Sequence, residues 1–286
     1  MNSLKSVFVS AYLTAAVVVT VFAVRSLISS QDYLTWGGVI LVTAPFLLVI
    51  SWIMIVRNVA RTSAHFPSLI GLGVLGLALS CWGYVQGGSL IAPMLALAAW
   101  LAFLIYAYWY SSFTHRASAQ LIVGKMLPAF KLTDVAGQSI SSASLTDKPA
   151  IWIFYRGNWC PLCMAQIKEV AGQYQQLQEL GVRVALISPQ PHRFTIGLAR
   201  KFDVPFDFLQ DEGNRAARAL GIDHPQGLPM GMQVLGYDSE TVLPTVIITG
   251  TGGRILWVHE TDNYRIRPDP DLYLAVLREH RAIAMP

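Results

Sequence analysis

The feature that most constrains this chain is its uneven charge, because the first 110 residues are almost uncharged. Only five charged side chains occur there: Lys5, Arg25, Asp32, Arg57 and Arg61. The other 17 of the 21 basic residues and 16 of the 17 acidic residues come after residue 110. The charged fraction is 13% overall, against about 25% in soluble proteins. We therefore predict an apolar domain at 1–110, a polar linker at 111–123 and a globular domain at 124–286.

Four apolar stretches fill the first domain, at about 7–24, 37–56, 67–85 and 89–110. Each is close to the roughly 20 residues that a helix needs to cross a hydrocarbon core of about 30 Å. None carries an interior charge, which would be costly in lipid. Aromatic side chains typical of membrane interfaces lie near the predicted ends: Trp36, Trp82, Tyr84, Trp109 and Tyr110. We predict four transmembrane helices, rather than a cleaved signal peptide followed by three.

The basic residues predict how these helices are oriented. With four spans, the N-terminus, the loop 57–66 and the C-terminal domain share one side of the bilayer. Five basic residues are on that side: Lys5, Arg57, Arg61, Arg116 and Lys125. The opposite side has only Arg25, next to Asp32. The positive-inside rule then places the C-terminal domain in the cytoplasm, and we expect an integral protein of a bacterial inner membrane, with the lipid bilayer as a partner.

One apparent motif in the apolar domain has a simpler explanation. The run GLGVLG at 71–76 matches the glycine fingerprint of dinucleotide-binding folds. That fingerprint requires a strand before it and a helix after it in a soluble unit, whereas this run lies inside an apolar span. We predict instead that small residues such as Gly76 and Ser80, or Ala92 and Ala96, let helices approach closely.

The C-terminal half alternates between strand-like and helical segments. Strands are expected at 148–155, 182–188, 205–210, 245–250 and 254–259, and helices at 163–180, 194–202, 212–220 and 270–281. This order indicates an α/β sandwich that starts with a right-handed parallel crossover and ends with an antiparallel hairpin. The predicted fold class is thus a four-helix transmembrane domain followed by an α/β thioredoxin-fold domain.

The stretch FYRGNWCPLC contains a cysteine pair, Cys160 and Cys163, between the first predicted strand and the first long helix. A helix N-terminus offers unpaired N–H groups and the positive end of the helix dipole. Both favour the thiolate, which is the nucleophile in redox chemistry. Pro161 suits a first helical turn, and Trp159 supplies an apolar surface beside the sulfurs. The pattern therefore predicts a redox-active disulfide.

Other roles for the cysteines agree less well with the sequence. A zinc site would need a second cysteine pair or histidines at ligand spacing, so we expect no metal and no cofactor. A static disulfide would be unusual in a reducing cytoplasm and would close only a short loop. Cys81, inside the third apolar stretch, is expected to be a small buried residue.

Several segments of the C-terminal half resemble the peroxiredoxin-like branch of the thioredoxin superfamily, the alkyl hydroperoxide reductase/thiol-specific antioxidant group. These segments are GKMLPAFKL, IFYRGNWCPLC, LPTVII and GGRILWVHETDNYRIRPDPD, and the resemblance covers about residues 121–283. No family is recognised for the membrane half. In thioredoxin-like proteins a cis-proline before a central strand faces the cysteine pair. The resemblance gives that role to Pro244, with Thr245 after it.

The chain departs from the peroxiredoxin active-site pattern P-x-x-x-T-x-x-C. Arg156 replaces the proline and Cys160 replaces the threonine, while Cys163 falls on the peroxidatic cysteine. The segment around Pro244 takes the place of the distant arginine that helps to hold the peroxide. Arg156, Arg265 and Arg267 are candidates to stabilise a thiolate or recognise an anion, although solvated surface arginine is the default interpretation for each.

These observations predict a membrane-anchored thiol–disulfide oxidoreductase that uses Cys160 and Cys163. The alternatives are a membrane-tethered hydroperoxide reductase and, from another class, a redox sensor or assembly module. We expect a thiol electron donor, a protein or a small molecule, and a disulfide or hydroperoxide substrate, with no nucleic acid among the partners. As an oxidoreductase of the thioredoxin type, the chain would attack with Cys160. As a peroxiredoxin, it would attack with Cys163. The sequence favours Cys160.

Overall fold

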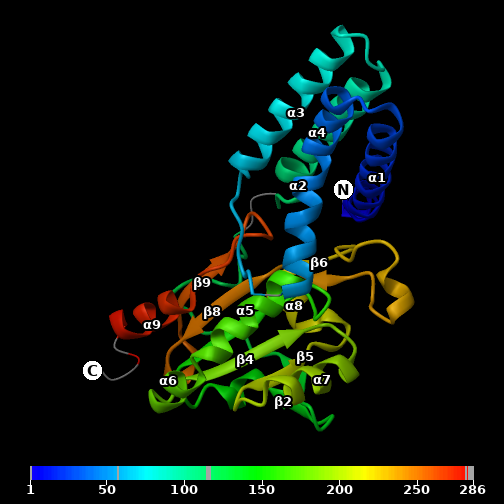
Figure 1. Cartoon of the computed structure of the whole chain (residues 1–286). Helices are drawn as coiled ribbons and strands as arrows, with labels where there is room; N and C mark the ends of the chain where they lie inside the picture. Colours follow the sequence, from blue (N-terminus) through cyan, green and yellow to red (C-terminus); the bar gives the residue numbers. More distant parts are fainter. Residues whose placement is uncertain (1, 57, 114–116, 281, 283–286) are drawn as a thin grey trace. The chain divides into compact units, whose positions relative to one another are not determined.

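The computed structural model describes residues 2–56, 58–113, 117–280 and 282. The chain forms two compact units (Figure 1). One comprises Leu4–Arg57 and Thr62–Ser112, and the other contains Asn58–Arg61 and Phe113–Pro286. Two basic residues named above, Arg57 and Arg116, lie outside the described residues.

The first unit consists of four long apolar helices. They are α1 (Asn2–Ser30), α2 (Tyr33–Val56), α3 (Pro67–Val85) and α4 (Ile91–Leu104), and α4 continues as a π-helical turn η1 (Ile105–Tyr110). Their apolar portions are 28, 24, 19 and 20 residues long. At about 1.5 Å per residue, even the shortest reaches about 28 Å. By length and composition all four can cross a membrane, as predicted. The helix α1 extends beyond 7–24 at both ends, because no glycine or proline interrupts it.

Small residues bring these helices into backbone contact. A Cβ atom added to Gly38 on α2 would lie 2.4 Å from the carbonyl oxygen of Gly76 and 2.6 Å from the backbone nitrogen of Ser80 on α3. On α4, Ala92 and Ala96 are fully buried. Close approach at small residues, as expected for membrane helices, is therefore confirmed, and the glycine run at 71–76 lies within α3.

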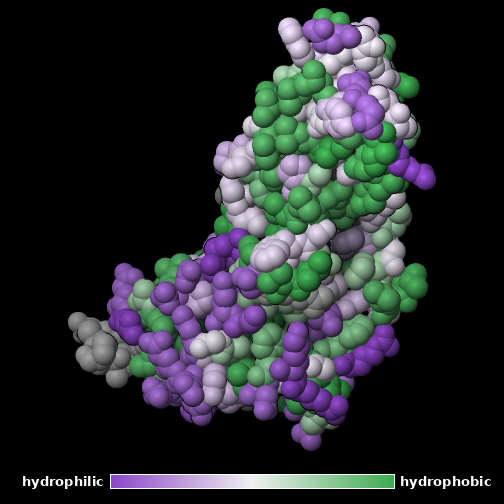
Figure 2. Space-filling view, viewed as in Figure 1, coloured by the Kyte–Doolittle hydropathy of each residue, from purple (hydrophilic) through white to green (hydrophobic). Residues whose placement is uncertain are grey.

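On the face that Figure 2 shows, the surface of the helical unit is mainly hydrophobic. Large apolar side chains such as Ile55, Val85 and Leu48 are 80%, 72% and 70% exposed. Cys81 is also exposed, so its predicted burial within the protein is wrong: it lies on an outward-facing side of α3. Exposed apolar surface of this extent is typical of a site that contacts a membrane or another protein.

The second unit is built on a seven-stranded mixed sheet with the order β2-β1-β5-β4-β3-β8-β9. Its strands are β1 (Lys131–Thr133), β2 (Ser139–Ser141), β3 (Ala150–Phe154), β4 (Arg183–Ser188), β5 (Asp207–Gln210), β8 (Thr245–Thr249) and β9 (Ile255–Glu260). The strands β3, β4 and β5 are parallel, and β8 and β9 are antiparallel. A separate pair is formed by β6 (Asp223–His224) and β7 (Thr241–Val242). The predicted parallel crossover and closing hairpin are both present.

Helices follow the strands in the order expected of a thioredoxin fold. They are α5 (Pro161–Gly172), α6 (Tyr174–Glu179), α7 (His192–Phe202), α8 (Arg215–Ala219) and α9 (Pro270–Glu279). Short 3₁₀ turns also occur in the described part of the unit: η2 (Ser142–Leu145), η3 (Glu212–Asn214), η4 (Met232–Leu235) and η5 (Thr251–Gly253).

Two parts of the second unit differ from the prediction. The expected helix 163–180 is divided at Gln173, which has φ −102° and ψ 13°. Gly172, a residue with a high cost in helices, precedes this break. The hairpin of β1 and β2 was not predicted, because strands of three residues are too short to show a periodic pattern.

The strand that leads to the cysteines, β3, lies buried at the centre of the sheet. All five residues of β3 are buried, and the Trp152 indole donates a hydrogen bond of 3.0 Å to Thr249 Oγ1 on β8. Buried parallel strands of this kind form near-continuous apolar runs. The loop that carries the cysteines therefore begins at the end of a well-packed strand.

Candidate active site

The cysteine pair lies where the sequence predicted it, at the N-terminus of the helix that follows β3. Cys160 is the N-cap residue of α5, and Pro161 occupies the first helical turn. Gly157 makes the turn before them with φ +145°, and a Cβ atom there would lie 2.6 Å from Trp159 Nε1. Glycine is thus required at this close approach.

The two sulfurs are close together and hidden from solvent. Their Sγ atoms lie 2.7 Å apart. The exposed fraction is 2% for Cys160 and 0% for Cys163. Neither sulfur is open to solvent, and a bulky partner cannot reach either of them in this conformation.

The surroundings shift the pKa values of the two thiols in opposite directions. Burial raises the pKa of the Cys163 thiol, but a hydrogen bond from Cys160, the charge of Arg267, and the backbone N–H and charge of Arg156 outweigh it, and its pKa is lowered to about 6. Burial and the hydrogen bond to Cys163 raise the pKa of Cys160 well above its ordinary value. The surroundings therefore favour ionisation of the Cys163 thiol over that of the Cys160 thiol.

Two of the three candidate arginines act on the sulfurs. Arg156 is 5% exposed and Arg267 is 4% exposed, so neither is a solvated surface residue. The Arg156 guanidinium lies over the Trp159 ring, 4.7 Å from its centroid, a favourable cation–π arrangement. Arg265 is also buried, at 1% exposure. The default interpretation of these arginines as surface residues is therefore wrong.

Polar residues that the sequence analysis did not select hold the loop before Cys160. The Gln190 carbonyl oxygen accepts from the Asn158 backbone N–H at 2.8 Å, and its amide donates to the Tyr155 hydroxyl at 3.0 Å. The Thr241 hydroxyl donates to the Arg156 carbonyl at 2.9 Å. Gln190 follows β4, the parallel neighbour of β3. The carboxyl ends of parallel strands meet at one edge of the sheet. The position of Gln190 just after β4 could therefore have indicated that it lies near the cysteine loop.

Pro244 and Thr245 lie beside this loop. Thr245 pairs with Phe154, the last residue of β3, in the antiparallel register of β8 and β3. None of the peptide bonds in the described ranges is cis, so the predicted cis-proline at Pro244 is wrong. The physical reason is that trans is the ground state even for X-Pro bonds. Thr245 is held locally by a hydrogen bond from its hydroxyl to the Leu243 carbonyl, 2.9 Å long.

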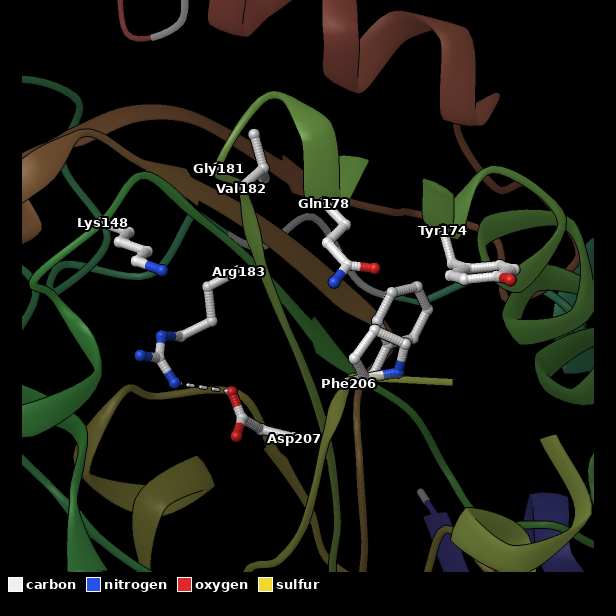
Figure 3. A pocket seen from close by; sticks show the side chains of 9 residues that line it. Lys148, Tyr174, Gln178, Gly181, Val182, Arg183, Phe206 and Asp207 are labelled. Atoms are coloured by element: carbon white, nitrogen blue, oxygen red, sulfur yellow. Dashed lines mark hydrogen bonds and ion pairs between the residues drawn. The ribbon is translucent and has the colours of Figure 1, made fainter. Parts of the chain in front are cut away.

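A larger pocket, of about 240 Å³, lies away from the cysteines (Figure 3). Arg183, the first residue of β4, lines it and pairs with Asp207 at 3.0 Å. Because β3 and β4 are parallel, this pocket lies at the opposite end of the sheet from the loop after β3. The hollow next to the cysteine loop, lined by Arg156, Trp159 and Gln190 among others, measures only about 10 Å³. Within the described part of the chain, no group of three or more His, Cys, Asp or Glu side chains is arranged to hold a metal ion.

In sequence, the domain that carries the cysteine pair is similar to the peroxiredoxins of the thioredoxin class. The AhpC/TSA family matches residues 123–258, which confirms the resemblance found in the sequence. The match begins at residue 123 and leaves the helical unit without a family.

Individual relatives agree with this assignment. The chain is 30% identical over 115 residues to a chloroplastic peroxiredoxin Q of Populus jackii, covering 39% of this chain and 53% of that protein. It is 29% identical over 104 residues to the corresponding Sedum lineare protein, covering 36% and 56%. The chain thus spans about half the length of the curated relatives that it matches.

Solved structures with a similar fold include a peroxidoxin BcpB from Mycobacterium tuberculosis. It has 21% identity and a TM-score of 0.45, covering 55% of this chain and 96% of that one. The AhpC of Enterococcus faecalis has 19% identity and a TM-score of 0.44, with 57% and 98% covered.

Proposed function

We propose that this protein is a membrane-anchored thiol peroxidase that reduces small hydroperoxides, with Cys163 as nucleophile and Cys160 as resolving cysteine. The observation that carries the proposal is the arrangement of the pair. The two sulfurs lie 2.7 Å apart, and the hydrogen bond between them, together with the charges of the buried Arg156 and Arg267, lowers the pKa of Cys163. The AhpC/TSA match and the peroxiredoxin relatives support the same activity.

The proposed reaction balances with one substrate and one reductant. The Cys163 thiolate attacks the terminal oxygen of the hydroperoxide, the O–O bond breaks, and the leaving alkoxide takes a proton to become an alcohol. Cys163 is then a sulfenic acid. Cys160 attacks its sulfur, water leaves, and an intramolecular disulfide forms. Two thiols from an external donor reduce this disulfide and restore the pair.

Burial favours a small oxidant over a protein disulfide. Exchange with a protein substrate requires the attacking sulfur to contact the disulfide of another chain, and Cys160 is 2% exposed with a raised pKa. A raised pKa leaves little thiolate for attack. Thiol–disulfide exchange with Cys160 as attacker remains the second candidate, because Cys160 occupies the place of the family's threonine.

Trapping the first intermediate tests this assignment. In Cys160→Ser, hydroperoxide should convert Cys163 to a sulfenic acid that persists, because the thiol that would condense with it has been replaced. Dimedone reacts with sulfenic acids, so the expected result is a dimedone adduct on the peptide that contains Cys163, detected by mass spectrometry. The contrary result is no adduct in Cys160→Ser, together with mixed disulfides that accumulate in Cys163→Ser. It would identify Cys160 as the attacking residue and favour disulfide exchange.

We also infer that the four apolar helices span a membrane and that the cysteine domain faces the cytoplasm. Helix length and the apolar exterior of the helical unit support the anchoring. The basic residues on one side of the predicted spans support the orientation. A reductant-rich cytoplasm would also keep Cys160 and Cys163 reduced between turnovers.

Reporter fusions test this topology. A reporter fused after residue 286 should be active as a cytoplasmic protein, and one inserted at 31–32, between α1 and α2, should behave as a protein on the opposite side. The same two fusions in a chain with added lysines at 31–32 serve as the control, because added positive charge should weaken or invert the bias. An external C-terminus in the unmodified chain would contradict the inferred orientation.

A further inference from the structure

A short piece of chain between two apolar helices is part of the cysteine-containing unit. Residues Asn58–Arg61, which follow α2, group with Phe113–Pro286 and not with the helical unit. Arg61 is the last residue of this piece, and its side chain is 35% exposed. What it contacts determines whether it is an ordinary surface arginine.

Each nitrogen of the Arg61 guanidinium has a partner. Nη2 lies 2.6 Å from Glu169 Oε2, and Nη1 lies 3.3 Å from Asp269 Oδ2. Nε donates to the carbonyl oxygen of Arg267 at 3.2 Å, and Nη2 also lies 3.5 Å from the carbonyl oxygen of Pro268. A planar arginine fork can satisfy several acceptors at once, which a lysine ammonium on a flexible stem does less well.

These partners belong to the two helices that flank the site. Glu169 is six residues after Cys163 on α5. Asp269 is the N-cap of α9 and accepts from the Asp271 backbone N–H with its other carboxylate oxygen, at 3.1 Å. Arg61 therefore ties α5 to the start of α9 and to the main chain just before it.

That main chain carries Arg267, one of the two arginines that stabilise the Cys163 thiolate. Its Nη1 donates to the Ile266 carbonyl at 2.9 Å. Its Nε and Nη2 are buried and have no hydrogen-bond partner among the residues that the structure describes. Few hydrogen bonds therefore hold the Arg267 guanidinium in place. The position of its charge depends mainly on the position of the Arg267 backbone.

We propose that Arg61 is a positioning residue for the reaction: it holds the Arg267 backbone so that the buried guanidinium stays beside the cysteine pair. It also neutralises Glu169 and Asp269, two carboxylates that would otherwise weaken the positive field there. The inference deepens the proposed function and rests on it. It makes a loop between two predicted membrane helices part of the site's support.

The pH dependence of Cys163 alkylation tests this role in the full chain in detergent micelles. Iodoacetamide labelling, followed peptide by peptide with mass spectrometry, gives the pH midpoint of the Cys163 thiol. In Arg61→Gln the midpoint should rise by about 1 pH unit, as expected when a favourable charge moves away from a thiolate. Labelling below the wild-type midpoint should fall about tenfold.

Two further variants distinguish a positioning role of Arg61 from an effect of its charge alone and from a general loss of stability. Arg61→Lys keeps the charge but cannot make all the fork contacts. It should also raise the midpoint, whereas a pure charge effect would leave it unchanged. This variant carries the test if Arg61→Gln does not fold. Arg183→Gln is the matched control, since Arg183 bridges Asp147 and Asp207 at the far end of the sheet, and its midpoint should equal that of wild type.

The outcomes are distinguishable. A wild-type midpoint near that of an ordinary thiol would contradict the proposed function itself, whatever Arg61 does. A low wild-type midpoint that both Arg61 variants leave unchanged would overturn only the positioning role. A midpoint shift in Arg183→Gln as large as that in Arg61→Gln would also overturn the positioning role. The loss of any ion pair would then be enough to shift the midpoint.

Discussion

Replacing Cys163 with serine should abolish hydroperoxide turnover, with a loss of about a thousandfold or more, as for other enzymes that lose their nucleophile. A serine hydroxyl is not ionised near neutral pH, so the thiolate that attacks the O–O bond is absent. The measurement is the steady-state consumption of a small organic hydroperoxide with dithiothreitol as the donor.

Cys81→Ser is the matched control for this loss. Cys81 is exposed on α3 in the helical unit, and we assign it no role, so its variant should turn over hydroperoxide at the wild-type rate. If Cys163→Ser kept a substantial share of the wild-type rate, Cys163 would not be the nucleophile.

Replacing Arg267 with methionine should slow the same reaction about tenfold to a hundredfold at pH 7. Methionine fills much of the space of the arginine stem but removes the charge. The Cys163 pKa is lowered to about 6 partly by this charge, so the wild-type rate should be near its plateau at pH 7. In the variant the pKa rises toward the ordinary cysteine value of about 8.5. The thiolate fraction at pH 7 falls accordingly.

The direction of the Cys163 pKa shift predicts how the turnover rate of each protein depends on pH. The wild-type rate should decrease as pH falls through about 6, because the thiolate is protonated there. The Arg267→Met rate should rise steadily above pH 7 and recover much of the loss in alkaline buffer. Arg254→Met, at an exposed residue whose guanidinium bonds the Gly124 carbonyl at 2.7 Å, should show the wild-type profile. A loss in Arg267→Met that alkaline pH does not recover would show a role other than thiolate stabilisation.

The parts of the fold that follow local rules could be predicted from the sequence. Apolar runs of membrane-spanning length, the alternation of β3, α5 and β4, and the glycines that let helices touch all leave a pattern in neighbouring residues. The cysteine pair belongs to this group, because Pro161 and the residues after it mark a helix start without any tertiary information.

The electrostatics of the site could not be predicted in this way. Arg156 and Arg267 are 111 positions apart in the sequence (267 minus 156), and only the sheet and α9 bring their charges to one sulfur. Burial of both thiols is also a tertiary property. The sequence therefore favoured Cys160, the sulfur nearest the helix end. In the structure the pKa of Cys163 is lowered instead, by its hydrogen bond with Cys160 and by the Arg267 and Arg156 charges.

Turnover by the purified wild-type chain, compared between a hydroperoxide and a protein disulfide with one thiol donor, tests the central claim most directly. The buried Cys163 thiolate predicts that the hydroperoxide is consumed catalytically while the protein disulfide is reduced no faster than by the donor alone. Catalytic reduction of the protein disulfide, with the hydroperoxide left unconsumed, would contradict the claim and identify a thiol–disulfide oxidoreductase that attacks with Cys160.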